Sequence, residues 1–596
     1  MKKFTLLLMM VCSSLAMYGQ YGHRLYYADS VSNEWFNDGL ITNLVLTNGE
    51  PVMVGAGRTQ GSTSGSIERS RFVRARLSGT QQNNRKYFIF KNGAEAASRV
   101  NSICEGNSYF LMSGAVISTT AAPITGGADI MLMKASSAGV PSNLVRLDLG
   151  GGYDEALCSR RSNKSATNFY TCGYSTIQGV NRAFVMKHNN TMSTISWVRT
   201  FSLPCQNGAT GSAEATSVID DSSSNTVIVV GNVKSPTPGV LCQQAFIAKF
   251  SSSGALQWLR FITSPDGSDF EFQSIRETGV AQQYVITGSV NLPGFNKRVL
   301  LYTVNTAGAA PVTIFAKGLY STGPTPNYII NSQTGYDVVT RVEPTKKEYF
   351  ICGANQYSNN LTDAIIFKTD NNGNPLALRF YFGVGKEQYN AIDYVNTIGT
   401  PGNGIASFGR FDKIVAPGSA PKSQSLLSKG YFNLDTGCSE IADNPIAVNL
   451  GIQYVSGTIS TINTYTKDTL TSQNSTVLQT TVCWKTNVSG GSNARVIGDG
   501  GEGIDEAETV SEFGFSIYPN PIATGNATVA VMTEKDDEAE IRIVDMMGRL
   551  ASAFTLPLQA GRNEAQFSVD ELPSGMYLVQ LTTMDGLSKT VRLVKP

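Results

Sequence analysis

The sequence predicts an all-β protein with a ring of repeated four-stranded units, a small β extension and a C-terminal β-sandwich. Three observations support this prediction. The chain of 596 residues contains 58 glycines and only 16% charged residues, against roughly 25% in an average soluble protein. A short apolar segment that ends in glycine recurs along most of the chain. Apolar residues alternate with polar ones in the last 84 residues.

The recurring apolar segment gives the period of the repeat. The glycines that end its seven copies are Gly55, Gly114, Gly173, Gly231, Gly288, Gly353 and Gly409, which are 59, 59, 58, 57, 65 and 56 residues apart. Each copy is followed by a strand that commonly ends in a basic residue, a turn with glycine and a third strand, and a less apolar strand leads into the next copy. Four strands in about 60 residues, repeated seven times, predict a seven-bladed β-propeller.

The N-terminal end of the repeated region supplies the strand that the last unit lacks. The seventh unit supplies strands at 390–395, 405–409 and 426–434 but lacks a strand of the third type, and such a strand lies at 24–28. An N-terminal strand in the last blade would close the ring and remove a free sheet edge. We therefore assign residues 20–437 to the propeller.

The remaining segments are assigned by composition. Residues 438–488 contain Thr-rich strand candidates with a cysteine near each end, and we interpret them as a small β extension clipped by a Cys438–Cys483 disulfide. Residues 489–512 are an acidic, Gly-rich flexible linker, because such tracts cannot bury a core. Residues 513–596 alternate with a period of two, which predicts a small β-sandwich.

Residues 1–19 have the pattern of a cleavable signal peptide. Lys2 and Lys3 precede a largely apolar run over 4–11, and the small residues Ser14 and Ala16 follow. The apolar run is too short for a stable membrane anchor, and cleavage after Ala16 or after Gly19 fits the pattern. We expect an exported protein without a transmembrane segment.

Ordered motifs in the last 84 residues resemble a known family. The early motif is Tyr518, Pro519, Asn520 and Pro521, the late motif is Gly575, Tyr577 and Leu578, and the basic terminal strand contains Lys589 and Lys595. Together they resemble the type A C-terminal sorting domain of cargo of the type IX secretion system. The resemblance implies recognition by the type IX translocon and removal of the domain by a sortase-like protease. It also implies a passenger that is attached to surface lipopolysaccharide or released, and hence a cell-surface or extracellular location. The repeated body resembles secreted bacterial β-propeller repeat proteins in architecture.

Composition and motifs exclude several functions. A net charge of +1 provides no field that would steer the protein to nucleic acid or to an anionic membrane. The chain has no CxxC zinc pattern and no Gly-rich phosphate loop before a helix, so we expect no cofactor. Its two histidines, His23 and His188, belong to different repeats, and we expect both in solvated positions.

Removal of the signal peptide would leave eight of the nine cysteines. An even number of cysteines in an oxidising compartment permits disulfides. Besides Cys438 and Cys483, we consider two pairs, Cys158 with Cys172 across adjacent strands and Cys205 with Cys242 across loops. Cys104 and Cys352 lie in strand contexts and are expected to be buried thiols.

Acidic residues recur shortly before the glycine strand of each unit. They are Glu34, Glu95, Glu155, Glu214, Asp269, Asp337 and Glu387. A functional interpretation is a cation site or paired carboxylates for glycoside chemistry at one face of the ring. The structural interpretation is that each carboxylate accepts backbone N–H groups where the chain crosses between blades, and we favour it because residues repeated with a fold usually serve the fold.

Two loops and three tryptophans suggest further ligands. The loops at 266–269 and 370–374 carry oxygen side chains around a glycine, and calcium is the alternative to a simple hairpin turn there. Trp35, Trp197 and Trp258 could stack on sugars, but the equivalent positions of Trp197 and Trp258 favour packing between blades.

We therefore expect a non-enzymatic binding or adhesion module for an extracellular glycan or protein. One alternative is a polysaccharide hydrolase or lyase that uses the acidic residues at the propeller face. Another is a structural component of the surface or matrix. The fold by itself cannot choose among them.

Overall fold

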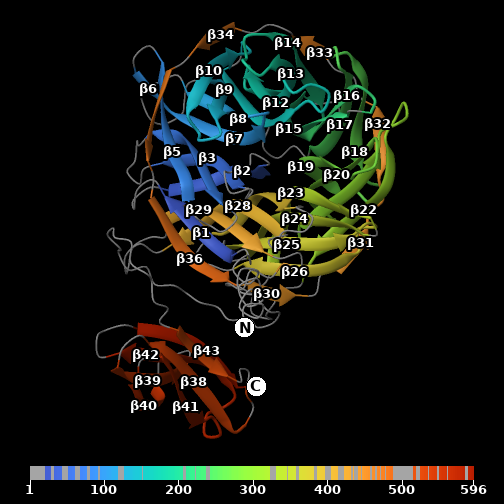
Figure 1. The fold of residues 1–596 in the computed structure, drawn as a ribbon. Coiled ribbons are helices and arrows are strands. Elements are labelled where there is room, and N and C mark those ends of the chain that lie inside the picture. The colour runs from blue at the N-terminus through green and yellow to red at the C-terminus, as the bar shows by residue number, and fades with distance from the viewer. Residues whose placement is uncertain are drawn as a thin grey trace, which may run out of the picture. The chain divides into compact units, whose positions relative to one another are not determined.

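The computed structural model describes residues 20–486 and 514–595, except for short segments within them. These segments are 28–32, 43–51, 61–66, 77–80, 92–93, 118–126, 151, 206–209, 222, 237–241, 322–329, 345, 358–360, 382–385, 396–403, 414–421, 431–433, 435–439, 444–445, 457–459, 463–465, 470, 477, 519–521, 523, 534–535, 546–549, 560 and 584–587. The predicted signal peptide, the linker and Cys438 lie outside the described residues. The chain divides into two compact units, Met1–Asn493 and Ala494–Pro596, and every described element in both is a strand (Figure 1).

In the first unit, consecutive strands pair antiparallel in sets of four, and we call each set a blade. Blade 1 contains β2 (Asn33–Thr42), β3 (Val52–Gln60), β4 (Glu68–Arg76) and β5 (Gln81–Lys91), with β6 (Ala94–Ala96) paired to β5. Blade 2 contains β7 (Ser98–Glu105), β8 (Tyr109–Ile117), β9 (Ala128–Ser136) and β10 (Pro141–Asp148). Blade 3 contains β11 (Tyr153–Arg161), β12 (Asn168–Ile177), β13 (Val180–Asn189) and β14 (Ile195–Pro204). Blade 4 contains β15 (Thr210–Asp221), β16 (Thr226–Lys234), β17 (Gln243–Ser251) and β18 (Leu256–Thr263).

The last blades continue the same order. Blade 5 contains β19 (Asp269–Glu277), β20 (Gln283–Asn291), β21 (Arg298–Asn305) and β22 (Val312–Tyr320). Blade 6 contains β23 (Ile330–Glu343), β24 (Lys346–Tyr357), β25 (Thr362–Asp370) and β26 (Pro375–Tyr381). Blade 7 contains β27 (Gln388–Val395), β28 (Gly404–Lys413), β29 (Lys422–Gly430) and the N-terminal strand β1 (Gln20–Tyr27).

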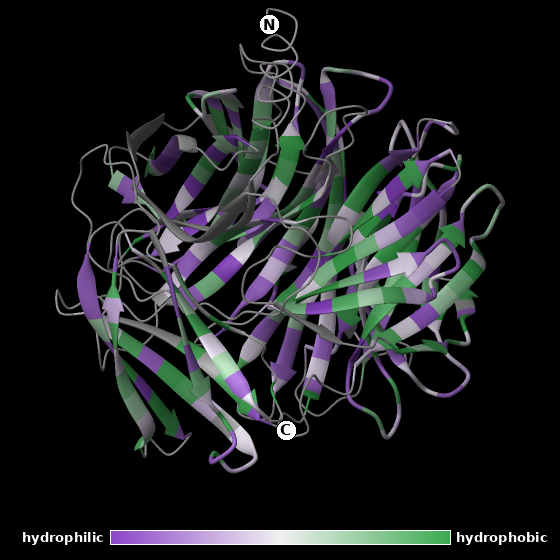
Figure 2. Cartoon of the chain, turned by 60° about the horizontal axis from the view of Figure 1, so that its bottom comes forward, coloured by the Kyte–Doolittle hydropathy of each residue, from purple (hydrophilic) through white to green (hydrophobic). Residues whose placement is uncertain are grey.

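The blades close into a propeller. β1 pairs with β29, so the first strand of the described chain completes the last blade, as the sequence predicts. The innermost strand of each blade contacts that of the next, and β27 contacts β2 to complete the circle. Seven buried apolar clusters each combine residues of two neighbouring blades. The middle strands β8 and β16 are buried along almost their whole length, because both faces of a blade pack against neighbouring blades, and Figure 2 shows many apolar residues along the strands.

The predicted small β extension does not form a sheet of its own. Its strands are β30 (Glu440–Asp443), β31 (Ile446–Asn449), β32 (Gln453–Ser456), β33 (Ser460–Ile462), β34 (Thr466–Thr469), β35 (Thr471–Thr476) and β36 (Leu478–Thr486). They pair antiparallel with the outermost strands of blades 6, 5, 4, 3, 2, 1 and 7, in that order. The segment, which we call the belt, therefore runs once around the rim of the ring (Figure 1). Each belt strand covers a sheet edge that would otherwise expose unpaired N–H and C=O groups.

Each innermost strand contains a β-bulge opposite the repeated glycine. The bulged residues are Asn37, Asn101, Leu157, Thr216, Gln273, Tyr336 and Asn390. The bulge brings a carbonyl oxygen against the glycine, so that a Cβ atom added at Gly173 would lie 1.9 Å from the oxygen of Glu155. In blade 1 the glycine at this position is Gly57, where an added Cβ would lie 2.1 Å from the oxygen of Trp35. The sequence assignment of Gly55 is therefore wrong by two residues.

The second unit is a β-sandwich of two antiparallel sheets. Its strands are β37 (Gly514–Tyr518), β38 (Asn526–Thr533), β39 (Asp537–Asp545), β40 (Leu550–Leu558), β41 (Gly561–Ser568), β42 (Gly575–Thr583) and β43 (Ser588–Lys595). One sheet has the order β37-β38-β41 and the other the order β40-β39-β42-β43. Ile517, Val529, Ile541, Val579 and Leu593 belong to the apolar core between them. The predicted sandwich is confirmed.

Among the described residues, no helix is long and apolar enough to cross a membrane.

Candidate functional site

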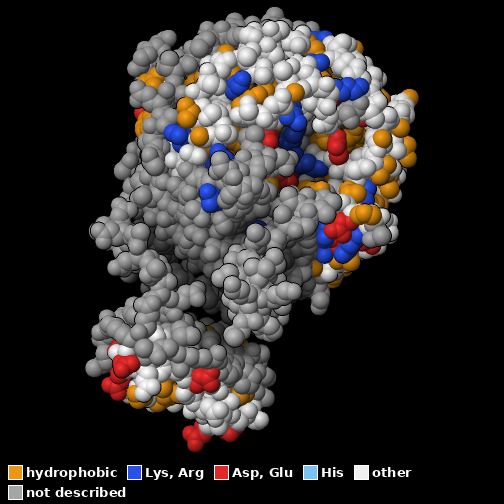
Figure 3. Space-filling view, viewed as in Figure 1, with side chains coloured by type: hydrophobic (Ala, Val, Ile, Leu, Met, Phe, Trp, Pro, Cys, Tyr) orange, Lys and Arg blue, Asp and Glu red, His pale blue; other side chains and the backbone are white. Residues whose placement is uncertain are grey.

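A cavity of about 320 Å³ lies where the innermost strands of all seven blades meet. We call it the axial cavity. All seven bulged residues line it, together with Trp35, Asp38, Arg58, Ser102, Cys158, Arg160, Ser217, Ser274, Arg276, Asp337, Gln388 and Arg410. Figure 3 shows Lys or Arg side chains inside the hollow on the described part of this face. A volume at the lower end of the range for ligand pockets, roughly 300–1,000 Å³, suits a small ligand.

Bulged side chains join neighbouring blades around the axial cavity. The Asn37 side-chain amide donates to the backbone oxygen of Val100 in the next blade (2.7 Å), and Asn101 donates likewise to Ala156 (2.9 Å). The Thr216 hydroxyl donates to the oxygen of Phe272 (2.9 Å). The Asn390 amide donates to the oxygen of Phe36 (2.6 Å), which links the last blade to the first. The remaining bulged residues, Leu157, Gln273 and Tyr336, make no such bond within the described part of the chain.

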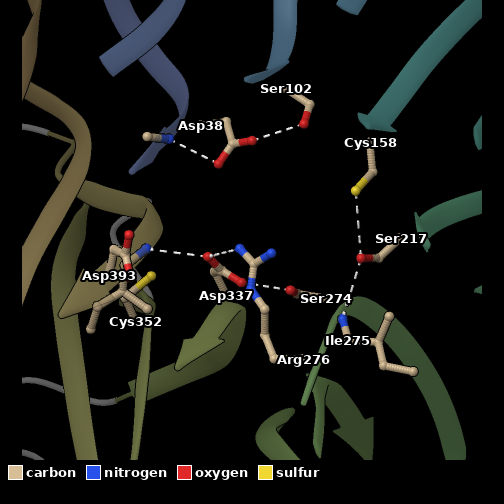
Figure 4. Close-up of polar contacts among 12 residues, drawn as sticks. Asp38, Ser102, Cys158, Ser217, Ser274, Ile275, Arg276, Asp337, Cys352 and Asp393 are labelled. Atoms are coloured by element: carbon tan, nitrogen blue, oxygen red, sulfur yellow. Dashed lines mark hydrogen bonds and ion pairs between the residues drawn. The ribbon is translucent and has the colours of Figure 1, made fainter. Parts of the chain in front are cut away.

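The residues after the bulges make a second set of bonds between blades (Figure 4). Asp38 accepts the backbone N–H of Ile103 in the next blade (3.0 Å), and Ser102 accepts that of Ser159 (3.1 Å). Ser217 accepts the N–H of Ile275 (3.3 Å), and Asp337 that of Ile392 (3.3 Å). Blade 7 has Ala391 at this position, and Asp393 accepts the N–H of Ile41 instead (2.8 Å). Desolvation raises the pKa of Asp393 to about 6.

The seven repeated acidic residues of the sequence analysis do not form a ring around the axis. Of the seven carboxylates, only Asp337 lines the axial cavity, where it binds Arg276 (2.7 Å) and the Ser274 hydroxyl (2.5 Å). The others precede the bulged residues by two to six positions, so they are not at equivalent places in the blades. Their partners are side chains: Glu34 pairs with Arg71, Glu95 with Arg69 (2.6 Å), Glu155 with Arg99 (2.9 Å), and Glu214 accepts from Asn181 (2.8 Å). Side chains rather than backbone N–H groups satisfy these four carboxylates, whereas Asp337 accepts the backbone N–H of Ile392 in the next blade (3.3 Å), as the structural interpretation expects.

Four arginines in the axial cavity were missed by the sequence analysis. Arg58 and Arg410 directly follow the glycines of blades 1 and 7, so the repeated Gly-Arg step was a usable signal. Arg160 and Arg276 come three residues after the bulged residues of blades 3 and 5. The sequence alone does not reveal the bulges that turn these residues toward the axis.

Some of the cysteine predictions are confirmed and one is wrong. Cys205 and Cys242 form a disulfide with an S–S distance of 2.06 Å, and Cys104 and Cys352 are buried thiols, as predicted. Cys158 and Cys172 are thiols as well, so the predicted disulfide between them is wrong in this structure. Cys158 follows a bulge, and its Sγ lies 3.7 Å from the Ser217 Oγ in the next blade. The Cys172 thiol, which donates to Cys158, lowers the pKa of Cys158.

Cys438 lies outside the described residues, so the Cys438–Cys483 disulfide stays a prediction. The backbone of Cys483 is described and pairs in β36 with His23 of β1.

His188 is fully buried in β13, so the predicted solvated position is wrong. Its Nδ1–H donates to the backbone oxygen of Asn189 (3.0 Å), and its Nε2 accepts from the Thr171 hydroxyl (2.9 Å). Burial lowers the pKa of His188 to about 4, so the ring is neutral at physiological pH. The residue serves packing and cannot act as an acid or base at the axial cavity.

The tryptophans have two environments. Trp197 and Trp258 are buried, and the Trp197 indole N–H donates to the oxygen of Ser252 in the next blade (2.9 Å), in agreement with packing between blades. Trp35 lines the axial cavity, and the Arg58 guanidinium lies 4.1 Å from the centroid of its ring.

The two candidate calcium loops are turns stabilised by their own aspartates: residues 370–374 form the hairpin between β25 and β26, whereas residues 266–269 connect β18 of blade 4 to β19 of blade 5. Asp370 accepts the backbone N–H groups of Asn372 (2.9 Å) and Asn374 (2.8 Å). Asp266 accepts the N–H (3.0 Å) and hydroxyl (2.6 Å) of Ser268. A different group, Asp129, Asp148 and Asp154, brings one carboxylate oxygen of each within 4.8 Å of the others. Arg146 pairs with Asp129 and with Asp148 (3.6 Å), so this group already contains a cation.

The described motif residues of the second unit lie in three of its strands, β37, β42 and β43. Gly575 begins β42, which also contains Leu578, and Lys589 lies in β43. The Tyr577 hydroxyl donates to the oxygen of Pro573 (2.7 Å). The Lys595 ammonium donates to the oxygens of Val569 (2.7 Å), Asp570 (3.0 Å) and Leu572 (2.6 Å). Tyr518 ends β37, whereas Pro519, Asn520 and Pro521 lie outside the described residues.

Comparison with known proteins identifies the second unit. Residues 516–595 match the model of the secretion system C-terminal sorting domain. Curated protein sequences contain no significant match. A domain of this family directs export to the cell surface or the extracellular space through the type IX secretion machinery.

Solved structures share only distant likeness with the chain. Sqt1 of Chaetomium thermophilum is 8% identical, with a TM-score of 0.32 over 69% of this chain and 98% of that chain. A neuraminidase-like protein of A/flat-faced bat is 12% identical, with a TM-score of 0.30 over 60% of this chain and 91% of that chain. Dimeric latent PorU of Porphyromonas gingivalis is 9% identical, with a TM-score of 0.13 over 88% of this chain and 35% of that chain.

Proposed function

We propose that this protein, which carries a type IX sorting domain and is exported to the cell surface or beyond it, is a non-enzymatic binding module. Its ligand, part of an extracellular glycan or protein, enters the axial cavity. After export, a sortase-like protease removes the sorting domain, and the passenger is attached to surface lipopolysaccharide or released.

The observation that carries this proposal is the bonding of the cavity carboxylates. Asp337 is held by Arg276 (2.7 Å), by Ser274 (2.5 Å) and by the N–H of Ile392 (3.3 Å). Asp38 accepts from Ser102 (2.9 Å), from the N–H of Ile103 (3.0 Å) and from that of Gly39 (2.8 Å). Glycoside hydrolysis requires one carboxyl group that donates a proton and a second that acts as a base or nucleophile. Both aspartates instead serve as acceptors that hold neighbouring blades together, which supports binding rather than catalysis.

The architecture also suits binding. Two sets of hydrogen bonds between blades hold the cavity lining in place, and a preformed site avoids the free-energy cost of ordering on association. The lining offers amides, hydroxyls and guanidinium groups of several blades together with the Trp35 ring. A few polar groups that converge beside an aromatic side chain are typical of sites for small polar ligands.

The test uses residues 20–596, which we call the mature chain although they retain the sorting domain. The chain is applied to an array of glycans and matrix proteins, and mass spectrometry of the same wells detects released products. We expect selective retention without products, and loss of retention in Leu157→Trp, whose larger side chain would occupy part of the axial cavity. Val312→Trp, at a surface residue of β22 that is 62% exposed, is the control and should retain its ligand. New cleavage products would support a hydrolase or lyase instead. Failure to bind any array component would favour a structural surface protein.

A further inference from the structure

The bulged side chains of the axial cavity differ in whether they form hydrogen bonds to the next blade. In blades 1, 2, 4 and 7 the bulged side chain donates to the next blade, as described above. Blades 5 and 6 depart from this pattern with Gln273 and Tyr336. Neither side chain has a hydrogen-bond partner within the residues that the structure describes. The departure leaves an amide and a phenol hydroxyl available on two neighbouring blades.

Positively charged side chains outnumber negatively charged ones in the lining of the axial cavity. Its lining holds four arginines and two aspartates, which leaves a net positive charge of two. Arg276 is neutralised by Asp337 (2.7 Å), and Arg160 faces Asp38 at 3.7 Å. Arg58 pairs with Glu68 (3.0 Å), which lies behind the lining.

Arg410 has no ion pair and no hydrogen bond with any residue that the structure describes. Its Nε atom is buried without an acceptor. A guanidinium group presents five N–H donors, and leaving such donors unmet in a partly desolvated position is unfavourable. The excess charge of the axial cavity is therefore concentrated at Arg410.

The three unmatched groups occupy one sector. Gln273, Tyr336 and Arg410 belong to blades 5, 6 and 7, which are consecutive in the ring. The Arg410 charge acts on Tyr336: burial raises the pKa of this tyrosine, and the guanidinium opposes the rise. At neutral pH the hydroxyl is protonated and can donate, so all three side chains offer N–H or O–H donors to the axial cavity from three consecutive blades.

We propose that this sector of the axial cavity binds an oxyanion, namely the carboxylate or sulfate group of an acidic saccharide. The Arg410 guanidinium supplies the balancing charge, and the Gln273 amide and the Tyr336 hydroxyl donate to the remaining oxygen lone pairs. Charge-assisted hydrogen bonds from arginine to such groups are about twice as strong as neutral ones. The inference deepens the proposed binding function and rests on it, because it names the chemical class of the ligand.

Isothermal titration of the mature chain tests the proposal. The probes are glucuronate for a carboxylate, glucose 6-sulfate for a sulfate, and glucose as the uncharged analogue. We expect at least one acidic sugar to bind ten times or more tightly than glucose, and sodium sulfate to compete with it. The acid that binds more tightly distinguishes the two sources of negative charge.

Variants assign the binding to this sector. Arg410→Gln should weaken binding of the acidic sugar about ten- to a hundredfold and so remove most of the difference in affinity between the acidic sugar and glucose. Tyr336→Phe and Gln273→Leu should each weaken it severalfold. The matched control is Arg379→Gln on the outermost strand β26, where the guanidinium donates to the oxygen of Leu378 (3.2 Å). This variant should bind as the unaltered protein does.

The outcomes separate this inference from the proposed function. Equal affinity for glucose and the acidic sugars, or an unchanged affinity in Arg410→Gln, would overturn the oxyanion site but leave a binding module. If no sugar binds while the array finds another ligand that Leu157→Trp abolishes, the oxyanion site is wrong and the module stands. If neither the titration nor the array finds a ligand, both proposals fail. Unfolding midpoints of all variants report whether they fold, and competition by sulfate with the unaltered protein needs no variant.

Discussion

At the scale of single residues, two buried ionisable groups should affect stability with opposite signs. His188 is buried with a pKa lowered to about 4, and Asp154 is buried with a pKa raised to about 6. Burial is the main cause for both, because it disfavours whichever form is charged. Both groups are therefore neutral over part of the acidic range, where an unfolded chain would carry charges at these positions.

The first prediction concerns His188. In an unfolded chain a histidine binds a proton below about pH 6.5, whereas the folded protein binds it only below about pH 4. Stability is therefore lost as the pH falls through this window, by up to about 3 kcal/mol from this group. His188→Gln should lose less stability than the unaltered protein between pH 7 and pH 4.5, as measured by urea unfolding. Parallel pH profiles for the two proteins would contradict the buried neutral histidine.

The second prediction concerns Asp154. An unfolded aspartate is ionised above about pH 4, whereas the folded protein ionises Asp154 only above about pH 6. The folded state is thus penalised at pH 7, and this penalty disappears as the pH falls through 6 toward 4. Asp154→Asn should raise the free energy of unfolding at pH 7 by up to about 2 kcal/mol and have little effect at pH 4. A loss of stability at pH 7 would contradict a burial penalty on the charged carboxylate.

At the scale of elements, the bulge and the glycine form one unit. Because of the bulge, two successive side chains of the innermost strand point toward the next blade. In blade 1, the Asn37 amide donates to the oxygen of Val100, and the Asp38 carboxylate accepts the N–H of Ile103. This geometry brings a carbonyl oxygen to the glycine of the neighbouring strand, which leaves no room for a side chain. The repeated glycine is therefore explained by close backbone approach and not by turn formation.

Gly173→Ala tests this unit. The added Cβ would lie 1.9 Å from the backbone oxygen of Glu155, so the bulge of blade 3 must shift. We expect a loss of about 2–4 kcal/mol in the free energy of unfolding, as for other severe steric substitutions. The control is Gly152→Ala, where the added Cβ has only an ordinary contact, 3.8 Å from the oxygen of Thr176. Equal losses in the two variants would refute the close-approach explanation.

The belt is the element with the clearest protective role. Its strands pair with the outermost strand of every blade, including β1. Without the belt, the outermost strands would expose unpaired backbone groups, and such edges template association with other chains. Deletion of residues 440–486 should therefore cause self-association, measured by size exclusion with light scattering. A monomeric and equally stable deletion variant would show that the belt is dispensable.

At the scale of the whole molecule, the chain consists of two units with separate cores. The apolar core of the sorting domain includes no residue of the propeller, from Ile517 at one end to Leu593 at the other. The apolar clusters of the propeller likewise include no residue of the sorting domain. This separation agrees with the proposed removal of the sorting domain after export.

Truncation tests the separation. Residues 20–493 should unfold with the same midpoint as the same unit in the mature chain, within about 1 °C, because a surface truncation usually changes stability by less than 0.5 kcal/mol. Differential scanning calorimetry of the mature chain should show a second transition that the truncated chain lacks. A lower midpoint after truncation would mean that the sorting domain stabilises the propeller.

Much of the architecture could be predicted because it depends on local pattern. The glycine strands, the N-terminal strand that completes the last blade and the alternation of the sandwich follow from residue order and period. The belt could not be predicted, because its short polar strands have no apolar period and acquire their pairing only from edges far away in the sequence. His188 was misjudged for a related reason: a polar segment beside a turn gives no indication that neighbouring blades cover it.

The sequence by itself determined the class of the fold, the closure of the ring and the export of the protein, since each depends on motifs or periods within one segment. Tertiary structure alone decided which residues meet at the axis. Seven bulges shift the register of the innermost strands, and a shift of one residue turns a side chain to the other face. Tyr336 and Arg276 face the axial cavity for this reason, whereas most of the repeated carboxylates do not.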